Sequence, residues 1–310
     1  MSLNKLTRSR IENLNVAIAS CQLLHFTPKE TTFSRQDTTH ICSATMAGVF
    51  KLPSLLRRYK PEHDLPRFCW DDVSIEKQVD SGAFGVVYLG RYASERIVVK
   101  TLKGESGESK KRFLKEAKLL YDVRGHNNVS QFKAFCDNPY AIIMEYSMFD
   151  FNPFGADKIV TTLQDFLHFV DYEYDFSSFS EILPVCASDV ATGLDFLHQR
   201  NIAHRDLKPG NVLVSNVHYV SKQGQDLEDF YAQCPIICKL ADFGLSRSLE
   251  LQTQSLLQSR TDSVFCGTPL YMAPELHLET LKNASQAELQ RCDIWSLGLI
   301  MYAMLNPNLS

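Results

Sequence analysis

The amino-acid sequence predicts an α+β fold in which a β-rich part precedes a mainly helical part. Residues 73–146 contain short stretches rich in β-branched and aromatic residues, separated by turn residues. Beyond residue 147, apolar residues recur at helical spacing, most clearly between residues 185 and 199. Hydrophobic residues make up 45% of the 310 residues, which is enough for a large buried core.

The charge balance gives no sign of a nucleic acid or an anionic membrane as partner, because 32 basic residues face 36 acidic ones and the net charge is −4. The nine cysteines follow no zinc-binding spacing, and we interpret them as reduced thiols. No apolar run approaches the ~20 residues of a transmembrane helix, and the first residues do not resemble a secretory signal. We therefore expect a cytoplasmic protein with no transmembrane segment and no nucleic acid partner.

Residues 1–72 are expected to form an N-terminal extension that is partly helical and partly disordered. Apolar residues recur at helical spacing between Ile11 and Cys21, whereas residues 27–45 are polar and rich in Thr and Ser. A basic group at residues 57–60 is consistent with a docking site for a partner, although a solvated linker is the simpler interpretation.

Residues 73–146 are predicted to form a small sheet with one helix. The expected strands are residues 73–79, 85–92, 97–102, 129–135 and 140–146. The expected helix is residues 110–122, where apolar positions recur at helical spacing. In the second part, the apolar run at residues 294–305 is too short for a membrane span and predicts a buried core helix.

The first chemical signal is a glycine-containing turn between the first two strands. Gly82 and Gly85 have no Cβ, so main-chain amides there can approach a polyphosphate. Lys100 lies near the end of the third strand, sixteen residues before Glu116 in the helix, which suggests an ion pair between strand and helix. Taken alone, these features also fit an ordinary turn and an exposed lysine.

The second signal is residues 204–211, His-Arg-Asp-Leu-Lys-Pro-Gly-Asn, which follow a helix and precede an apolar strand. Asp206, Lys208 and Asn211 can converge from this one loop. They offer a carboxylate to orient a hydroxyl group, a cation for phosphate oxygens and an amide for a metal ion. The third signal is Asp242, which follows the apolar strand at residues 236–240, where a carboxylate is a natural Mg²⁺ ligand.

A fourth signal follows in the sequences Gly-Thr-Pro at residues 267–269 and Ala-Pro-Glu at residues 273–275. In this order, the four signals resemble the eukaryotic protein kinases, and the lysine at position 208 together with Gly-Thr-Pro resembles their serine/threonine branch. The resemblance covers residues 73–310. It implies a bilobal fold, with a small antiparallel β-sheet N-lobe carrying one helix at residues 73–146. Residues 147–310 would form a mainly helical C-lobe that is incomplete.

The resemblance implies an ATP- and Mg²⁺-dependent kinase that phosphorylates serine and threonine hydroxyls of proteins. Asp206 would accept the proton of the substrate hydroxyl, and Lys208 would contact the γ-phosphate. Asn211 and Asp242 would bind Mg²⁺. The residues implied in ATP binding are Val79, Gly82, Phe84, Gly85, Val87, Val98, Lys100, Glu116, Met144, Glu145, Tyr146 and Leu213.

The resemblance also implies residues that support the site. Thr268 would bond Asp206 and Lys208, and phosphorylation of Thr261 or Ser263 would regulate the enzyme through Arg205. An apolar spine would join the lobes and be anchored by Asp293. Its members would be Leu120, Phe132, His204 and Phe243.

The sequence also departs from the family pattern. Asp80 replaces the first glycine of the turn, residues 217–235 form an insertion, and the last helices of the C-lobe are missing. An alternative is therefore a non-catalytic kinase-like binding or scaffold module, or an inactive truncated product. A P-loop nucleotidase is excluded, because no Gly-Lys-Ser/Thr follows a glycine loop.

Overall fold

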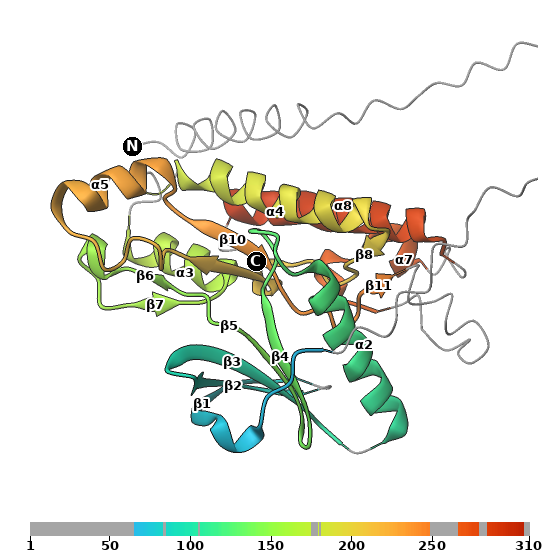
Figure 1. The fold of residues 1–310 in the computed structure, drawn as a ribbon. Helices are drawn as coiled ribbons and strands as arrows, with labels where there is room; N and C mark the ends of the chain where they lie inside the picture. Colours follow the sequence, from blue (N-terminus) through green and yellow to red (C-terminus); the bar gives the residue numbers. More distant parts are fainter. Residues whose placement is uncertain are drawn as a thin grey trace, which may run out of the picture.

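The computed structural model describes residues 65–82, 85–104, 106–174, 179, 181–248, 266–278 and 284–306. They form an N-lobe, which is a β-sheet with one long helix, and a mainly helical C-lobe (Figure 1). The predicted helix near residues 11–21, the basic group at residues 57–60 and the phosphorylation candidates Thr261 and Ser263 lie outside the described residues. The α+β fold predicted from the sequence is confirmed.

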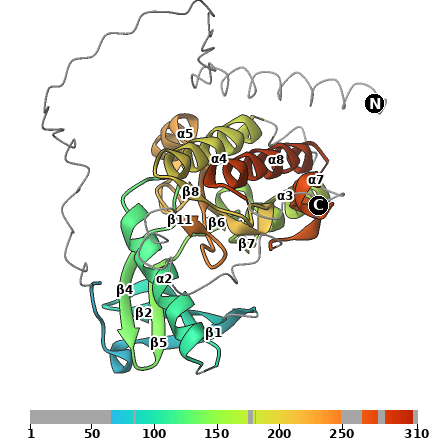
Figure 2. The same cartoon turned by 90° about the vertical axis from the view of Figure 1, so that its right-hand side faces the viewer.

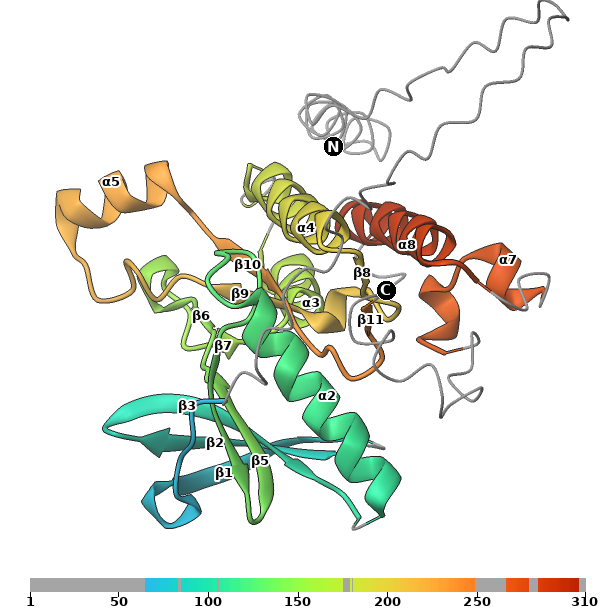
Figure 3. The same cartoon turned by 45° about the vertical axis from the view of Figure 1, so that its right-hand side comes forward.

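The N-lobe sheet is antiparallel throughout and has the strand order β1-β2-β3-β5-β4. Its strands are β1 (Ser74–Ser81), β2 (Gly85–Tyr92), β3 (Glu95–Leu102), β4 (Phe132–Asp137) and β5 (Tyr140–Glu145). Helix α2 (Gly107–Val123) crosses the sheet on one side, as Figure 3 shows. Phe113, Ala117 and Leu120 recur on the buried side of α2, which explains why this amphipathic segment docks as a helix.

The side chains of strand β3 alternate between the two faces of the sheet. Ile97 and Val99 are fully buried in a cluster that includes Phe68 and Ala134. Because side chains alternate along a strand, Val98 and Lys100 point to the opposite face. This alternation aims Lys100 at Glu116 on α2.

Residues 65–72, which the sequence analysis places in the extension, pack against the N-lobe. The Phe68 main-chain N–H donates to Phe135 O over 3.3 Å, and Phe135 N–H donates to Pro66 O over 2.8 Å. Leu65 and Phe68 are buried, and a 3₁₀ turn (Trp70–Asp72) leads into β1. These residues therefore form a short covering segment along the edge of β4.

The C-lobe consists mainly of helices α3 (Leu163–Glu173), α4 (Ile182–Gln199) and α8 (Gln286–Leu305), with α4 and α8 side by side (Figure 2). A β-ribbon of β9 (Val212–Ser215) and β10 (Ile237–Leu240) packs against α4. The shorter elements are β6 (Phe149–Asp150), β7 (Ile159–Val160), β8 (Ile202–Ala203), β11 (Arg247–Ser248), α7 (Pro274–His277) and 3₁₀ turns at Asn152–Phe154, Pro209–Asn211 and Pro269–Tyr271. No helix within these ranges combines the length and hydropathy that crossing a membrane requires.

The insertion predicted at residues 217–235 contains helix α5 (Gly224–Gln233), which the sequence analysis does not anticipate. Tyr219 is fully buried, and its hydroxyl donates to Pro235 O over 2.6 Å. The Tyr231 ring lies 5.6 Å from that of Phe154. The insertion thus contains a helix that projects from one end of the C-lobe (Figure 3) and contacts it through Tyr231.

Helix α8 begins eight residues before the apolar run that predicted it, at a capping box formed by Ser285 and Glu288. Ile300 and Met304 are buried, as expected of a core helix. Trp295 and Tyr302 are 47% and 53% exposed, so the prediction of a buried helix holds for one side of α8 only.

Gly193 is a position at which any side chain should destabilise the fold. A Cβ there would lie 2.6 Å from Asn128 O and 3.2 Å from Leu240 Cγ, so α4 must move away from β10. Gly193→Ala is expected to lower the free energy of unfolding by ~1–3 kcal/mol, measured by urea denaturation.

Gly298→Ala on α8 is the matched control, because a Cβ there meets no atom within 4 Å. It should raise the stability by up to ~1 kcal/mol, since alanine favours a helix more than glycine does. Equal urea midpoints for the two variants would contradict the close packing of α4 on Asn128.

Candidate active site

Lys100 pairs with two carboxylates, one from each lobe. Its Nζ lies 2.6 Å from Glu116 Oε1 on α2 and 3.0 Å from Asp242 Oδ1 in the segment after β10. The lysine and glutamate side chains are 11% and 6% exposed, so this is a buried ion pair. The strand-to-helix pairing suggested by the sequence is therefore present.

The charges of this cluster shift one another's ionisation. Burial opposes the positive charge of Lys100, but the Glu116 and Asp242 carboxylates outweigh it and raise the pKa of the ammonium group. Burial likewise opposes ionisation of Asp242, but the nearby Lys100 outweighs it and lowers the pKa of that carboxyl group. Burial raises the pKa of Glu116, which Lys100 only partly offsets. Lys100 is thus charged throughout the physiological pH range.

Asp242 is placed beside Asn211 by the β9–β10 ribbon. The Ala241 N–H donates to Asn211 O over 2.9 Å, and Asp242 adopts a left-handed backbone with φ +58°. Its side chain is 52% exposed, so the carboxylate faces an open side of the site. Gly244 follows, and its N–H approaches Asp242 Oδ1 at 3.4 Å.

The loop at residues 204–211 forms a connected polar group around Asp206. The Asn211 side-chain amide donates to Asp206 O over 2.7 Å and to Asp206 Oδ2 over 2.9 Å. The Thr268 hydroxyl donates to Asp206 Oδ1 over 2.8 Å and accepts a hydrogen bond from Lys208 Nζ over 2.7 Å. The structure therefore contains both hydrogen bonds expected of Thr268.

Asp293 of α8 anchors this loop. Its carboxylate accepts the main-chain N–H groups of His204 and Arg205, each over 2.8 Å, and lies 3.0 Å from His198 Nε2. Arg205 has φ +71°, which is unfavourable for a side-chain-bearing residue, so these bonds hold a strained turn in place. All four predicted spine residues are buried, and the rings of His204 and Phe243 lie 5.3 Å apart.

The residues predicted to contact the adenine line one face of the sheet and the ribbon. Val98 pairs across the strands with Met144, and Val87 pairs with Lys100. The side chains of Val87, Val98, Met144 and Leu213 are partly exposed. The Tyr146 side chain is partly buried, and the Arg96 guanidinium lies 5.9 Å from the centre of its ring.

The glycine turn is only partly described. Phe84 lies outside the described residues, Val79 is 50% exposed, and a Gly82 Cβ would meet no atom within 4 Å. At Gly85, by contrast, a Cβ would lie 2.6 Å from Thr101 O. Gly85 is therefore required by the close approach of β3, independently of any ligand.

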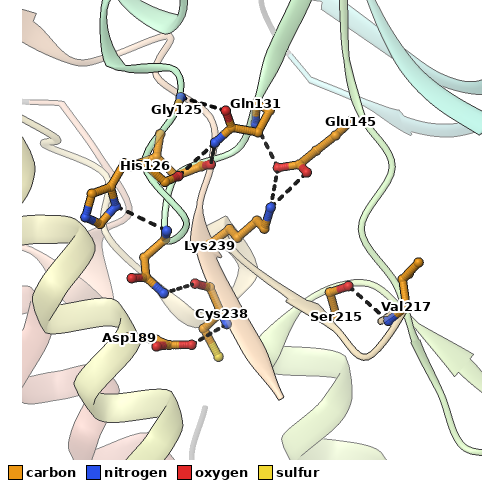
Figure 4. Close-up of polar contacts among 11 residues, drawn as sticks. Gly125, His126, Gln131, Glu145, Asp189, Ser215, Val217, Cys238 and Lys239 are labelled. Carbon is orange, nitrogen blue, oxygen red and sulfur yellow. Dashed lines mark hydrogen bonds and ion pairs between the residues drawn. The ribbon is translucent and has the colours of Figure 1, made fainter. Parts of the chain in front are cut away.

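Lys239, which no motif in the sequence singles out, binds one of the predicted residues. Lys239 Nζ lies 2.8 Å from both carboxylate oxygens of Glu145, so the glutamate side chain points to β10 (Figure 4). One signal was available in the sequence, namely a lysine within the otherwise apolar strand at residues 236–240. Its partner could not be found, because the two residues are 94 positions apart.

The family model described as "Protein kinase domain" matches residues 73–309. The chain belongs to the protein kinase family. This kinase is 29% identical over 228 residues to MAP kinase-interacting serine/threonine-protein kinase 2 of Xenopus laevis, covering 73% of this chain and 42% of that protein. It is 30% identical over 209 residues to MAP kinase-interacting serine/threonine-protein kinase 1 of Xenopus tropicalis, covering 67% and 43%.

A third relative of the kinase is mitogen-activated protein kinase kinase kinase 13 of Mus musculus, which is 27% identical over 240 residues. That alignment covers 76% of this chain and 19% of the relative. The kinase thus matches less than half the length of each of these curated relatives. The family resemblance stated from the motifs is confirmed.

Proposed function

We propose that this chain is an ATP- and Mg²⁺-dependent kinase that transfers the γ-phosphate of ATP to serine and threonine hydroxyls of proteins. The observation that carries the proposal is the joined set of Lys100, Glu116 and Asp242 beside the Asp206–Asn211 loop. These side chains come from both lobes, and each holds a hydrogen bond that orients it. Such preorganised charges are what phosphoryl transfer requires of a protein.

On this proposal, ATP lies between the sheet and the ribbon. Val79, Val87, Val98, Met144 and Leu213 would contact the adenine, with Glu145 and Tyr146 at the hinge, the point where the chain passes between the lobes. Gly82, Phe84 and Gly85 would cover the phosphates. Lys100, oriented by Glu116, would bind the α- and β-phosphates.

Asp242 and Asn211 fit a magnesium ion. They offer carboxylate and amide oxygens, the hard donors that Mg²⁺ prefers, and the Asp242 carboxylate is half exposed and ionised by its proximity to Lys100. Asn211 is fixed through its NH₂ group by Asp206, which leaves its carbonyl oxygen as the donor to a metal. When bound, Mg²⁺ would neutralise charge on the phosphate oxygens.

Asp206 would orient the acceptor hydroxyl and take its proton. In the structure it accepts a hydrogen bond from the hydroxyl of Thr268, which supports a role for this carboxylate in binding a hydroxyl group. Lys208 lies 3.5 Å from Asp206 and would steady the transferred phosphate.

We also propose that the kinase phosphorylates serine and threonine and that it is cytoplasmic. Two of the relatives carry "serine/threonine-protein kinase" in their names. The cysteines among the described residues are free thiols, in keeping with a reducing compartment. The proposal also includes a partner protein that docks on residues 1–72.

The decisive test is phosphoamino acid analysis of a mixed protein substrate incubated with labelled ATP, Mg²⁺ and the chain. We expect phosphoserine and phosphothreonine. Predominant phosphotyrosine would contradict the proposed specificity. ATP binding without any transfer would instead favour the non-catalytic kinase-like module.

Asp80, which replaces the first glycine of the turn, is expected to weaken ATP binding. Its carboxylate is exposed and accepts the Ser81 N–H over 2.7 Å, next to the turn that would cover the phosphates. Asp80→Gly is expected to lower the KM for ATP about twofold at low salt, because like charges repel weakly across water.

Asp80→Asn is the matched variant, since it removes the charge without adding glycine flexibility, and it should lower the KM similarly. The measurement is the KM for ATP across a salt series. A KM that stays constant at all salt concentrations in both variants would show that Asp80 does not influence the nucleotide.

A further inference from the structure

An ion pair beside the candidate nucleotide site joins the end of β5 in the N-lobe to β10 in the C-lobe. Lys239 Nζ lies 2.8 Å from Oε1 and 2.8 Å from Oε2 of Glu145. The lysine and glutamate side chains are 14% and 21% exposed, so solvent and salt screen the pair weakly. This contact therefore links the two lobes directly.

The loop between α2 and β4 is attached to the same glutamate. The Gln131 main-chain N–H donates to Glu145 Oε1 over 2.8 Å. The Gln131 side chain closes the loop, because its Oε1 accepts from Gly125 N and its Nε2 donates to His126 O and Val129 O (Figure 4). The loop and the end of β5 are thus held together as one unit.

The same loop is hydrogen bonded to β10. Leu240 N–H donates to Asn128 O and Ser130 N–H donates to Leu240 O, each over 2.9 Å. On the other side of the strand, Asp189 of α4 accepts the Cys238 N–H over 2.8 Å. Strand β10 is therefore fixed to α4, to the loop and, through Lys239, to the hinge.

Lys239 and Glu145 each lie close in sequence to residues at one end of the candidate nucleotide site. Lys239 stands three residues before Asp242, and Glu145 is the last residue of β5 before Tyr146. Lys239 is paired across the ribbon with Leu213. Because cross-strand partners share a face of the ribbon, Lys239 lies beside the residue proposed to contact the adenine.

We propose that Lys239 is a positioning residue that, through Glu145, fixes the separation between the adenine-binding hinge and the metal-binding Asp242. This inference rests on the proposed function. A nucleotide with its metal ion engages both ends of the site at once, and it gains the full affinity only if their separation is already set. Without the link, binding must first order the two ends, which weakens the combined affinity.

The test compares ATP binding with and without Mg²⁺ by titration calorimetry in Lys239→Met, which keeps the length of the side chain and removes its charge. We expect the affinity measured in EDTA to change less than about twofold. The gain in affinity conferred by Mg²⁺ should fall about fivefold or more, the size of an ordinary coupling between sites. Lys239→Arg should restore the gain, because a guanidinium can donate to both carboxylate oxygens.

Lys133→Met is the matched control, since Lys133 forms an ion pair with Glu95 on the same sheet without linking the lobes. Glu145→Gln is a second variant, which keeps an acceptor for Gln131 N–H and removes the charge from the other side. It should show the same loss as Lys239→Met. Hydrogen exchange at the Ser130 and Leu240 amides should also accelerate in Lys239→Met and not in the control.

Three results would overturn the proposal: an unchanged Mg²⁺ gain in both link variants, no restoration by Lys239→Arg, or an equal loss in Lys133→Met. Each of them presupposes that the wild type binds ATP, so the proposed function would survive. A wild type that binds ATP under neither condition would refute the proposed function, and the positioning role would fall with it.

Discussion

Lys100→Met and Asp242→Asn are each expected to reduce phosphoryl transfer by about a thousandfold or more while the chain stays folded. Each substitution removes a charge placed to face the phosphates or their metal ion, and such groups contribute most of the rate enhancement in phosphoryl transfer. The fold should tolerate Lys100→Met, because Glu116, whose pKa burial already raises, can take up a proton once its partner is lost.

The measurement is transfer from labelled ATP, with the melting temperature of each variant recorded in parallel. Lys222→Met is the control, since Lys222 lies in the insertion, where its Nζ lies 5.2 Å from the centre of the Phe230 ring. It should retain wild-type activity. Comparable transfer by the wild type and by both site variants would end the kinase proposal.

Asp293→Ala is expected to affect activity and stability together. The carboxylate is 1% exposed and accepts the amides of His204 and Arg205. Its removal leaves the buried His204 N–H and the partly buried Arg205 N–H without their acceptor and releases the strained turn at Arg205, so the free energy of unfolding should fall by ~2–4 kcal/mol. Asp206 would lose its fixed position, and transfer should fall at least about a hundredfold.

Urea denaturation and steady-state kinetics on the same samples check this prediction. Gln290→Ala is a nearby control on α8, because it removes only the hydrogen bond from Gln290 Nε2 to His198 O. Gln290→Ala should lower the free energy of unfolding and the rate of transfer much less than Asp293→Ala does. Full activity in Asp293→Ala would show that the loop at residues 204–211 holds its shape without this anchor.

The sequence predicts the elements whose pattern is local. Strand β2 is found with the predicted bounds, and α2 and α4 differ by a few residues at their ends, because alternation and helical spacing report directly on which side of each element is buried. The approach of Lys100 to Glu116 and the bonds of Thr268 could also be anticipated, since the motifs fix their order along the chain.

The remaining features depend on partners that are distant in sequence. Val129 and Ser130 lie within a predicted strand, but they pair with Leu240 of β10, and β4 begins only at Phe132. Helix α5 attaches through few residues, chiefly Tyr231. Nothing in the sequence around Lys239 indicates its pairing with Glu145, which the fold brings close at the end of β5. None of these pairings leaves a periodic signal.

The covering segment at residues 65–72 has a consequence for solubility. A sheet edge with unpaired main-chain groups invites pairing with another chain. At β4 this edge is occupied by Pro66 and Phe68, which bond Phe135. At the opposite edge, β1 is exposed along its whole length, but its pairing with β2 is interrupted by two irregularities and it carries charged side chains, both of which discourage such pairing. Loss of residues 65–72 would uncover the β4 edge, and the chain would then associate edge to edge.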